Sequence, residues 1–333
     1  MNPPTTSLRD GFGREIRYLR ISVTDRCDFR CTYCMAEDMT FLPRQTVLTL
    51  EEIQRVATIF TELGIRKIRI TGGEPLVRRS LPSLLFGLRA LPLLDTLAMT
   101  TNGSQLVQMA EPLKQAGVDS LNISIDTLDP AQFKAITRTG DLDQVLRGID
   151  AAIAQRFRRI RLNVVALAGL NDNQILPLVD YALSRCVDIA FIEEMPLGQV
   201  TVGGKALRLL PSASVQALIE QAHELSPLSD EDIGGPARYF SVPNTDSRIG
   251  FISPHSNNFC HLCNRLRITA DGRLLLCLGN EDSISLRDLM RQGANNDEIK
   301  SAIVSALESK PERHFFDQPD QPQIVRFMNM SGG

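Results

Sequence analysis

Apolar residues recur along the first two-thirds of the chain in two alternating rhythms, one typical of strands and the other of helices. The expected strands are Tyr18–Thr24, Lys67–Thr71, Thr96–Asn102, Ser120–Asp126, Arg159–Leu167 and Asp188–Pro196. The expected helices between them are Leu50–Leu63, Leu81–Leu91, Gln105–Ala116, Leu142–Gln155 and Asp172–Arg185. This α/β order predicts a parallel sheet with right-handed crossovers. Six units fall short of the eight that close a full barrel, so we favour a partial (β/α)6 barrel over a doubly wound open sheet.

Four of the expected strands alternate apolar and polar residues, whereas a parallel strand covered on both faces is apolar throughout. In the first strand Leu19 and Ile21 share one face, while Arg20 and Ser22 share the other. The polar faces of the other three carry Lys67, Arg69 and Thr71; Asn122, Ser124 and Asp126; and Arg159, Arg161 and Asn163. If the apolar faces meet the helices, the polar faces line a common lumen that suits an anionic ligand. A sheet face exposed to water is the alternative, but four matching strands favour the lumen.

The strand–helix rhythm weakens after Leu197. We expect a helix over Ser212–Leu225, a hairpin turn at Asp271-Gly272, and helices near Leu286–Arg291 and Asp297–Glu308. The strands of the hairpin are Arg265–Thr269 and Arg273–Leu278. We therefore predict two regions: a barrel domain over residues 1–245, and a C-terminal region over residues 246–333 that covers the barrel mouth.

The composition is that of an ordinary soluble globular protein, with 333 residues, 43% hydrophobic, 23% charged and a net charge of −3. The near-neutral balance argues against a general binder of nucleic acids or membrane surfaces, so an anion site must be built locally. The chain has no apolar run of about 18 residues and no secretory signal at its start. We expect a cytoplasmic protein.

Cysteines form two triplets and a single residue: Cys27, Cys31 and Cys34 (the first thiol set); Cys260, Cys263 and Cys277 (the second thiol set); and Cys186. In a reducing compartment such clusters more often bind metal than form disulfides. Each set offers three soft ligands, one fewer than a cubane or a tetrahedral zinc requires, so a bound metal would keep an open position. We expect the isolated Cys186 to be a small buried hydrophobe.

The first thiol set, with C-x3-C-x2-C spacing directly after a strand, resembles the signature of the radical S-adenosylmethionine enzymes. Thr71-Gly72-Gly73-Glu74-Pro75, at the end of the second strand, resembles the GGEP segment of that superfamily. Over essentially the whole chain the sequence closely resembles one of its families, the GTP 3′,8-cyclases of molybdenum-cofactor biosynthesis. The segments that carry this resemblance are Tyr18–Cys27, Thr100–Gly103, Asn122–Asp126, Phe191–Pro196, Cys260–Arg267 with Cys277, and the terminal Gly332-Gly333.

This resemblance implies two [4Fe–4S] clusters, one on each thiol set, and S-adenosylmethionine on the open iron of the first. Cleavage of that cofactor would give a 5′-deoxyadenosyl radical, which takes hydrogen from ribose C3′ of GTP. The carbon radical would then attack C8 of the guanine, on the way to 3′,8-cyclo-7,8-dihydro-GTP. The open iron of the second cluster would bind the guanine base.

The resemblance also assigns residues. Those that match contacts to S-adenosylmethionine are Tyr33, Gly73, Ser124 and Met195. Those that match contacts to GTP are Arg20, Arg69, Thr100, Arg161, Arg265, Leu266 and Arg267. The family usually has lysine where this chain has Arg161, and a planar guanidinium is not interchangeable with an ammonium. The tail, Gly332 and Gly333, would enter the active site and support catalysis.

Three other interpretations compete. A Cys3His zinc site could use His261 with the second thiol set, but adjacent Cys and His side chains seldom converge on one metal, so we expect His261 to be a neighbour of the cluster. A peptide-modifying radical enzyme would usually show a longer cysteine series after its barrel. An iron–sulfur electron carrier would want four-thiol clusters on a smaller scaffold.

Partners follow from the same resemblance. They are GTP, the downstream cyclic pyranopterin monophosphate synthase, an electron donor such as flavodoxin or ferredoxin and, as an option, a second copy of the chain in a homodimer. Neither nucleic acid nor a membrane is expected as a partner.

Overall fold

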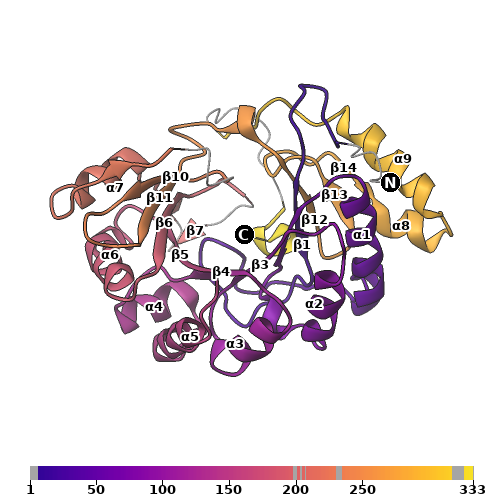
Figure 1. The fold of residues 1–333 in the computed structure, drawn as a ribbon. Coiled ribbons are helices and arrows are strands. Elements are labelled where there is room, and N and C mark those ends of the chain that lie inside the picture. The colour runs from indigo at the N-terminus through magenta and orange to yellow at the C-terminus, as the bar shows by residue number, and fades with distance from the viewer. Residues whose placement is uncertain are drawn as a thin grey trace.

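The computed structural model describes residues 7–197, 201–202, 205–206, 208–229, 235–316 and 326–332. Its centre is a parallel sheet of six strands in chain order: β1 (Tyr18–Ser22), β2 (Lys67–Thr71), β3 (Thr96–Thr101), β4 (Ser120–Ser124), β5 (Arg159–Ala166) and β6 (Asp188–Glu193). The sheet curls into an open arc with the helices on its outer side (Figure 1). This arrangement confirms the predicted partial barrel rather than a doubly wound sheet, which would carry helices on both faces.

The outer layer contains α1 (Leu50–Glu62), α2 (Leu81–Arg89), α3 (Leu106–Gln115), α4 (Pro130–Thr137), α5 (Leu142–Ala154) and α6 (Ile175–Ser184). The 3₁₀ turns η1 (Arg44–Thr46), η2 (Pro75–Val77) and η3 (Asp172–Gln174) lie between these elements. Helix α4 was not among the expected elements. Its start is marked by Asp129, whose carboxylate accepts the Gln132 amide at 2.7 Å, and by Pro130 at the first helical position.

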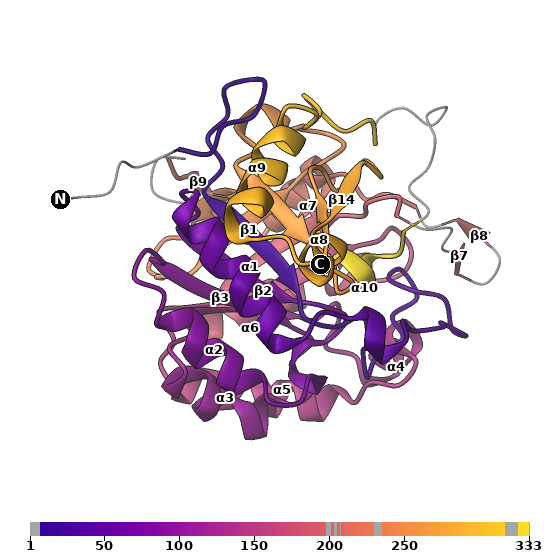
Figure 2. The same cartoon turned by 90° about the vertical axis from the view of Figure 1, so that its right-hand side faces the viewer.

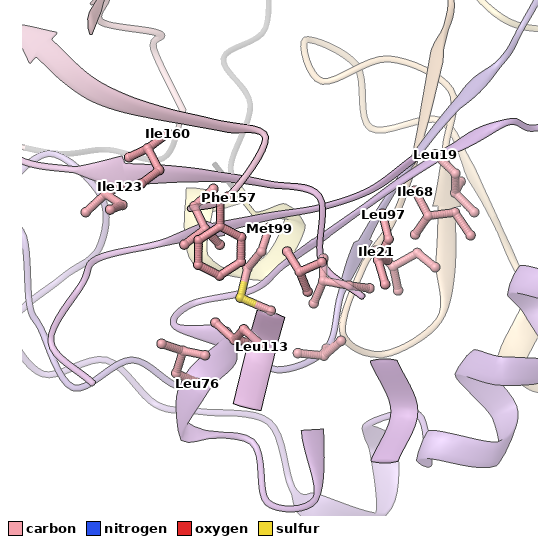
Figure 3. Close-up of a cluster of buried hydrophobic side chains, with 14 of the residues drawn as sticks. Leu19, Ile21, Ile68, Leu76, Leu97, Met99, Leu113, Ile123, Phe157 and Ile160 are labelled. Atoms are coloured by element: carbon pink, nitrogen blue, oxygen red, sulfur yellow. The ribbon is translucent and has the colours of Figure 1, made fainter. Parts of the chain in front are cut away.

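The predicted apolar faces of the strands form the core between sheet and helices. Leu19 lies opposite Ile68 in the β1–β2 register, Ile68 lies opposite Leu97 in the next, and all three are fully buried. Figure 3 shows these side chains in one cluster with Met99 and with Leu113 of α3. Burying a side chain of this size stabilises the fold by about 1.5–3 kcal/mol. Because the apolar residues of each strand turn outward to the helices, the polar residues must face inward.

Strands from the last third of the chain extend the same sheet at both edges. They are β9 (Ser226–Pro227), β10 (Arg238–Ser241), β11 (Arg248–Ile252), β12 (Arg265–Ile268), β13 (Arg273–Leu275) and β14 (Ser283–Ser285). Strand β12 pairs in parallel with β1, and β11 pairs in parallel with β6. A separate two-stranded sheet contains β7 (Thr201–Val202) and β8 (Lys205–Ala206). The division into regions at residue 245 stays a prediction, and strands from both sides of it share one sheet.

The predicted hairpin at Asp271-Gly272 is confirmed, because β12 and β13 are antiparallel and Gly272 has φ +81°. The remaining helical elements are η5 (Cys260–Leu262), α7 (Ser212–Ile219), α8 (Leu286–Arg291), α9 (Asn296–Leu307) and α10 (Met328–Ser331). Helices α8 and α9 lie beside α1 (Figures 1 and 2). Lys300 of α9 pairs with Glu62 of α1 at 2.9 Å. Throughout the described ranges, the structure contains no helix with the length and apolar character needed to cross a membrane.

Candidate functional site

The first thiol set lies on the loop that follows the carboxyl end of β1, and the end of α4 holds this loop. The backbone amides of Arg30 and Thr32 donate to the carbonyls of Thr137 and Ile136, each at 2.9 Å. Carbonyls in the last turn of a helix have no partner within the helix, so these bonds satisfy α4 and fix the loop together. The helix that sequence reasoning missed therefore positions the three thiols.

The Gly-Gly segment after β2 packs directly on the start of this loop. The Gly73 amide donates to the Thr24 carbonyl at 2.7 Å, and the Glu74 amide donates to the Arg26 carbonyl at 2.8 Å. A Cβ atom at Gly73 would lie 2.3 Å from the Arg26 carbonyl oxygen, which excludes any side chain. The glycine thus allows the second strand's loop to approach the backbone that precedes Cys27.

Glu74, next to this glycine, is a fully buried carboxyl group. It accepts the Thr101 hydroxyl and the Asn102 amide, both at 2.7 Å, and the Leu76 amide at 3.0 Å. Burial raises its pKa to about 8, against the effect of these donors. Asn102 in turn donates to Asp28 of the thiol loop at 2.7 Å, so Glu74 links the ends of β2 and β3 to the first thiol set.

Tyr33 and Ser124, two of the expected S-adenosylmethionine contacts, belong to the same end of the barrel. The Tyr33 hydroxyl donates to Asp126 at 2.7 Å, and Ser124 is the last residue of β4, two positions earlier. Asp126 also accepts the Val165 amide at 2.9 Å, and burial raises its pKa to about 6. Gly73, at the end of β2, lies at the same edge of the sheet, while Met195 follows β6 and faces the lumen.

The predicted polar lumen is confirmed as a cavity of about 710 Å³. Its wall contains the predicted site residues Arg20, Arg69, Arg161, Met195, Arg265 and Arg267, together with all three thiols of the second set. Thr100 is not part of this wall but contacts Arg69 Nη1 at 3.4 Å. Leu266 is buried in the core on the opposite face of β12 from Arg265 and Arg267, so only its backbone can reach toward the cavity.

Positive charge dominates this cavity. Nine arginine and lysine side chains line it, against two aspartates, among the residues that the structure describes. Asp188 is already paired with Arg248 at 2.7 Å. Burial lowers the pKa of Arg20 to about 10, and Arg69 and Arg265 add to that effect. Burial, with Arg20 and Arg265 close by, also holds the pKa of Arg267 well below its usual range. Such crowding of buried cations calls for a polyanionic ligand.

The alternation places Lys67 on the lumen face as expected, but Tyr18 and Tyr239, two further residues of this wall, were not predicted. Tyr18 accepts the Arg69 Nε at 2.7 Å. Burial alone would raise its pKa, but Arg69, Arg20 and Lys67 prevail and bring it to about 7. Tyr18 occupies the same strand face as Arg20, so the alternation could have found it.

Tyr239 of β10 had no comparable signal in the sequence. Its hydroxyl accepts Arg161 Nη1 at 2.5 Å, and Arg161 Nε donates to Asn163 at 2.9 Å. The Arg161 guanidinium, at the position where the resemblance implies a lysine, is therefore held by two partners on the cavity wall. Its plane is fixed before any ligand arrives.

The second thiol set lies at the opposite end of β1 from the first. Arg265, two residues after Cys263, is in register with Tyr18, the first residue of β1. Cys27 instead follows the last residue of that strand. The lumen therefore separates the two sets along the barrel axis, with the second set in the cavity wall.

Both thiol sets fit an iron–sulfur cluster better than zinc. Among the described parts of the chain, no group of three or more His, Cys, Asp or Glu side chains is placed to hold a single metal ion. His261 is exposed, as expected for a neighbour rather than a ligand. Each set supplies three thiols, and those of the second set lie together in the cavity wall, which matches the donor set of a cubane with one open iron.

The thiols of the second set have cationic neighbours that the sequence did not reveal. Lys310 Nζ lies 3.6 Å from Cys263 Sγ. Burial would raise the pKa of Cys263, but Lys310 and Arg265 outweigh it and bring the pKa to about 7. A thiol so poised is readily available as a thiolate ligand.

The described tail of the chain, which contains α10, reaches the segment before the first thiol set from inside the arc of the sheet, where the yellow ribbon lies in Figure 1. Asn329 Nδ2 donates to the Asp25 carbonyl at 3.0 Å. Arg267 Nη1 donates to the Gly332 carbonyl at 2.6 Å. Gly332 is buried with φ +73°, and a Cβ atom there would lie 2.3 Å from Thr71 Cγ2, so only glycine fits. Gly333 lies outside the described residues.

The expectation for Cys186 was wrong. Its side chain is exposed, because the residue sits with φ +53° in the turn between α6 and β6 and does not share the buried face of either.

Comparisons with known proteins agree with this geometry. Residues 21–182 match the model of the radical SAM superfamily, and residues 187–316 match that of Molybdenum Cofactor Synthesis C. The chain is 56% identical to a GTP 3′,8-cyclase of Marinobacter nauticus, over 99% of this chain and 100% of that one. It is 59% identical to GTP 3′,8-cyclase 1 of Pseudomonas aeruginosa, over 98% and 100% of the two chains.

Among solved structures, the fold is similar to that of Streptococcus suis SuiB bound to S-adenosylmethionine. The TM-score is 0.63 at 18% identity, over 94% of this chain and 76% of that one. At this identity the likeness concerns the fold alone.

Proposed function

The chain belongs to the GTP 3′,8-cyclase family of radical S-adenosylmethionine enzymes, and we propose that it converts GTP into 3′,8-cyclo-7,8-dihydro-GTP with its two thiol sets at opposite ends of one lumen. The observation that carries this proposal is the cavity wall, which joins the second thiol set to an arginine cluster. A nucleoside triphosphate offers both features a partner, a base for the open iron and phosphates for the guanidinium groups.

We assign the first thiol set to the cluster that binds S-adenosylmethionine. When bound there, the two groups supply a radical that abstracts hydrogen from the substrate. The chain's own contribution is to orient and enclose them: α4 fixes the loop, and Tyr33, Ser124 and Gly73 border it at the ends of β1, β4 and β2. Met195, which follows β6, lines the cavity itself.

We assign the triphosphate to the arginine cluster. Arg265 and Arg267 share one face of β12 and can present two guanidinium forks to phosphate oxygens. Arg20 faces the same lumen from the neighbouring β1, directly in register with Arg267. These cations repel one another, and burial deprives them of water. Phosphate oxygens would offset both effects.

Two further arginines are held in place by partners on the wall. Arg69 donates to Tyr18 and to the Met99 carbonyl, and Thr100 lies beside it. Arg161 is held by Tyr239 and Asn163, so this chain offers an oriented fork where the family usually offers an ammonium.

The wider setting follows from the same function. We expect the enzyme to work in the cytoplasm, to receive electrons from a flavodoxin or ferredoxin, and to pass its product to the cyclic pyranopterin monophosphate synthase. A homodimer stays a prediction from the family.

Anaerobic turnover tests the proposal. Reconstituted protein would be incubated with dithionite, S-adenosylmethionine and GTP deuterated at C3′, and the products analysed by mass spectrometry. We expect one deuterium in 5′-deoxyadenosine and a cyclised nucleotide isomeric with GTP. ATP in place of GTP is the matched control. If GTP leaves 5′-deoxyadenosine formation unchanged and no cyclised nucleotide appears, the proposal is wrong.

A further inference from the structure

Lys310, just beyond the end of α9, is a lysine buried behind the second thiol set. It is 2% exposed, its Nζ lies 3.6 Å from Cys263 Sγ, and it donates to the Leu276 carbonyl, one residue before Cys277. It does not line the substrate cavity, whereas Cys263 and Cys277 do. The ammonium therefore approaches the thiols from the protein side and leaves the cavity side to the substrate.

A buried ammonium requires a negative partner. Within the described ranges, no carboxylate pairs with Lys310, and its contacts are a backbone carbonyl and the sulfur of Cys263. Lys300, in the preceding helix, differs, because it pairs with Glu62 at 2.9 Å and Asp297 at 3.3 Å. In the part of the chain that the structure describes, the negative charge nearest to Lys310 is that of the second thiol set and what it binds.

The backbone around Lys310 is held firmly in place. Arg14 donates to the carbonyls of Pro311 and Glu312, each at 2.7 Å, and to the Cys260 carbonyl at 2.8 Å. Its own charge is balanced by Asp10 at 2.6 Å. One arginine thus ties the segment after Lys310 to the turn that carries Cys260, which fixes the distance between the ammonium and the thiols.

We propose that Lys310 is a positioning residue of the second cluster, which donates a charge-assisted hydrogen bond to Cys263 Sγ and stabilises the negative charge of the three thiolates and the cluster. This inference rests on the proposed function, which puts a cluster on that set. Hydrogen bonds to ligating sulfur and nearby positive charge raise the reduction potential of an iron–sulfur cluster, and partners behind the ligands strengthen metal retention. Lys310 therefore makes the second cluster easier to reduce and slower to lose iron.

The test compares Lys310→Met with Lys310→Gln in a background where Cys27, Cys31 and Cys34 are all serine, so that only the second cluster can form. A potentiometric titration followed by electron paramagnetic resonance gives its reduction potential. Iron release to a chelator gives its retention. We expect both variants to have a lower potential, and iron release to accelerate by about tenfold or more. Glutamine keeps a hydrogen-bond donor near the Leu276 carbonyl, whereas methionine does not. An effect that both variants share is therefore due to the loss of the positive charge.

Lys300→Met in the same background is the matched control, since it removes a lysine charge far from the thiols, and it should change neither measurement. Thermal melting shows whether each variant keeps the fold. If Lys310→Gln melts like the parent and its potential and iron release match those of Lys300→Met, the inference is wrong and the proposed function stands. If the background protein with Lys310 intact holds no cluster at all, the assignment of the second thiol set fails, and this inference fails with it.

Discussion

The two thiol sets lie at opposite ends of the lumen and in opposite electrostatic surroundings. Burial raises the pKa of the thiols in both sets. Neighbouring acidic side chains raise the pKa further in the first set, whereas neighbouring cations lower it in the second. Acidic side chains that act on the first set are Asp28, Glu74 and Asp126. Cations that act on the second set are Arg14, Arg265, Arg267 and Lys310. The difference teaches that two sites with the same donor set can be prepared for ligands of opposite charge, which supports the proposed sulfonium cofactor at one end and the proposed triphosphate at the other.

The two sets also differ in how the chain builds them. The first comes from one loop of eight residues, fixed by the end of α4. The second combines a turn before β12 with a residue after β13 and depends on contacts to the distant Arg14 and Lys310. The ligands of the first site are therefore local in the sequence, although distant segments hold their loop, whereas the ligands of the second site themselves come from two separate segments.

Cysteine substitution in each set should separate the two roles with the largest effect. We expect both Cys31→Ser and Cys260→Ser to abolish formation of the cyclised nucleotide. Only Cys31→Ser should also abolish 5′-deoxyadenosine, because the first set alone supports cofactor cleavage. Mass spectrometry of both products, with iron counts on each variant, makes the distinction. Normal cyclisation by Cys260→Ser would contradict the role given to the second set.

Arg267 connects the substrate end to the tail, so its removal should weaken substrate binding strongly. Losing a charged hydrogen bond typically costs about 1.5–3 kcal/mol, which is about 10- to 150-fold in KM for GTP. We expect this rise in Arg267→Ala and a partial recovery in Arg267→Lys, which keeps the charge but not the fork. Steady-state kinetics provide the measurement, with Arg273→Ala, an exposed arginine outside the cavity wall, as the control. An unchanged KM would remove Arg267 from the phosphate site.

Gly332→Ala should displace the tail, which contacts Arg267 at the substrate end and Asp25 near the first thiol set, and it should leave both thiol sets in place. The alanine must adopt a positive φ and avoid Thr71, and the conformational cost alone is about 1–2 kcal/mol. We expect the tail to leave its place, with roughly a 5- to 30-fold fall in kcat for cyclisation. Both clusters should remain, as judged by iron content. Gly293→Ala, at an open turn with positive φ, is the matched control for backbone strain.

Tyr18 gives the test with the smallest expected effect. The charges that shift its pKa are Arg69, Arg20 and Lys67, which all lie at the substrate end of the lumen. Its pKa of about 7 in the folded protein lies below its ordinary value of 10, so the ionised form stabilises the fold. That stabilisation is complete above pH 10 and is lost as the pH falls through 7. Between pH 7 and pH 10, the melting temperature of the substrate-free wild-type protein should therefore rise relative to that of the substrate-free Tyr18→Phe variant.

GTP should cancel this difference, since its phosphates neutralise the arginines that depress the pKa of Tyr18. Calorimetry in buffers of different ionisation enthalpy should detect proton uptake when GTP binds near pH 8, and none when S-adenosylmethionine binds. Equal proton uptake by wild type and Tyr18→Phe would show that Tyr18 does not titrate there.

Much of the fold and half of the site could be predicted from local patterns. Alternation along β1, β2, β4 and β5 places Arg20, Arg69 and Arg161 in a lumen because side chains on a strand have a period of two. The thiol spacings are likewise local. Lys310 and Tyr239 could not be found this way, since their importance lies in contacts to Cys263 and Arg161 that span 47 and 78 positions of the chain. Helix α4 was missed although its Asp-Pro start was readable.

The edge strands β11 and β12 have a consequence for synthesis of this protein. Until they leave the ribosome, the nascent sheet carries unpaired backbone along both β1 and β6, and such edges recruit strands from other chains. Parallel pairing across almost the full length of a chain is also slow to form. We therefore expect the cell to depend on chaperones during this interval, and chains that stop before β11 to aggregate rather than persist as a smaller barrel.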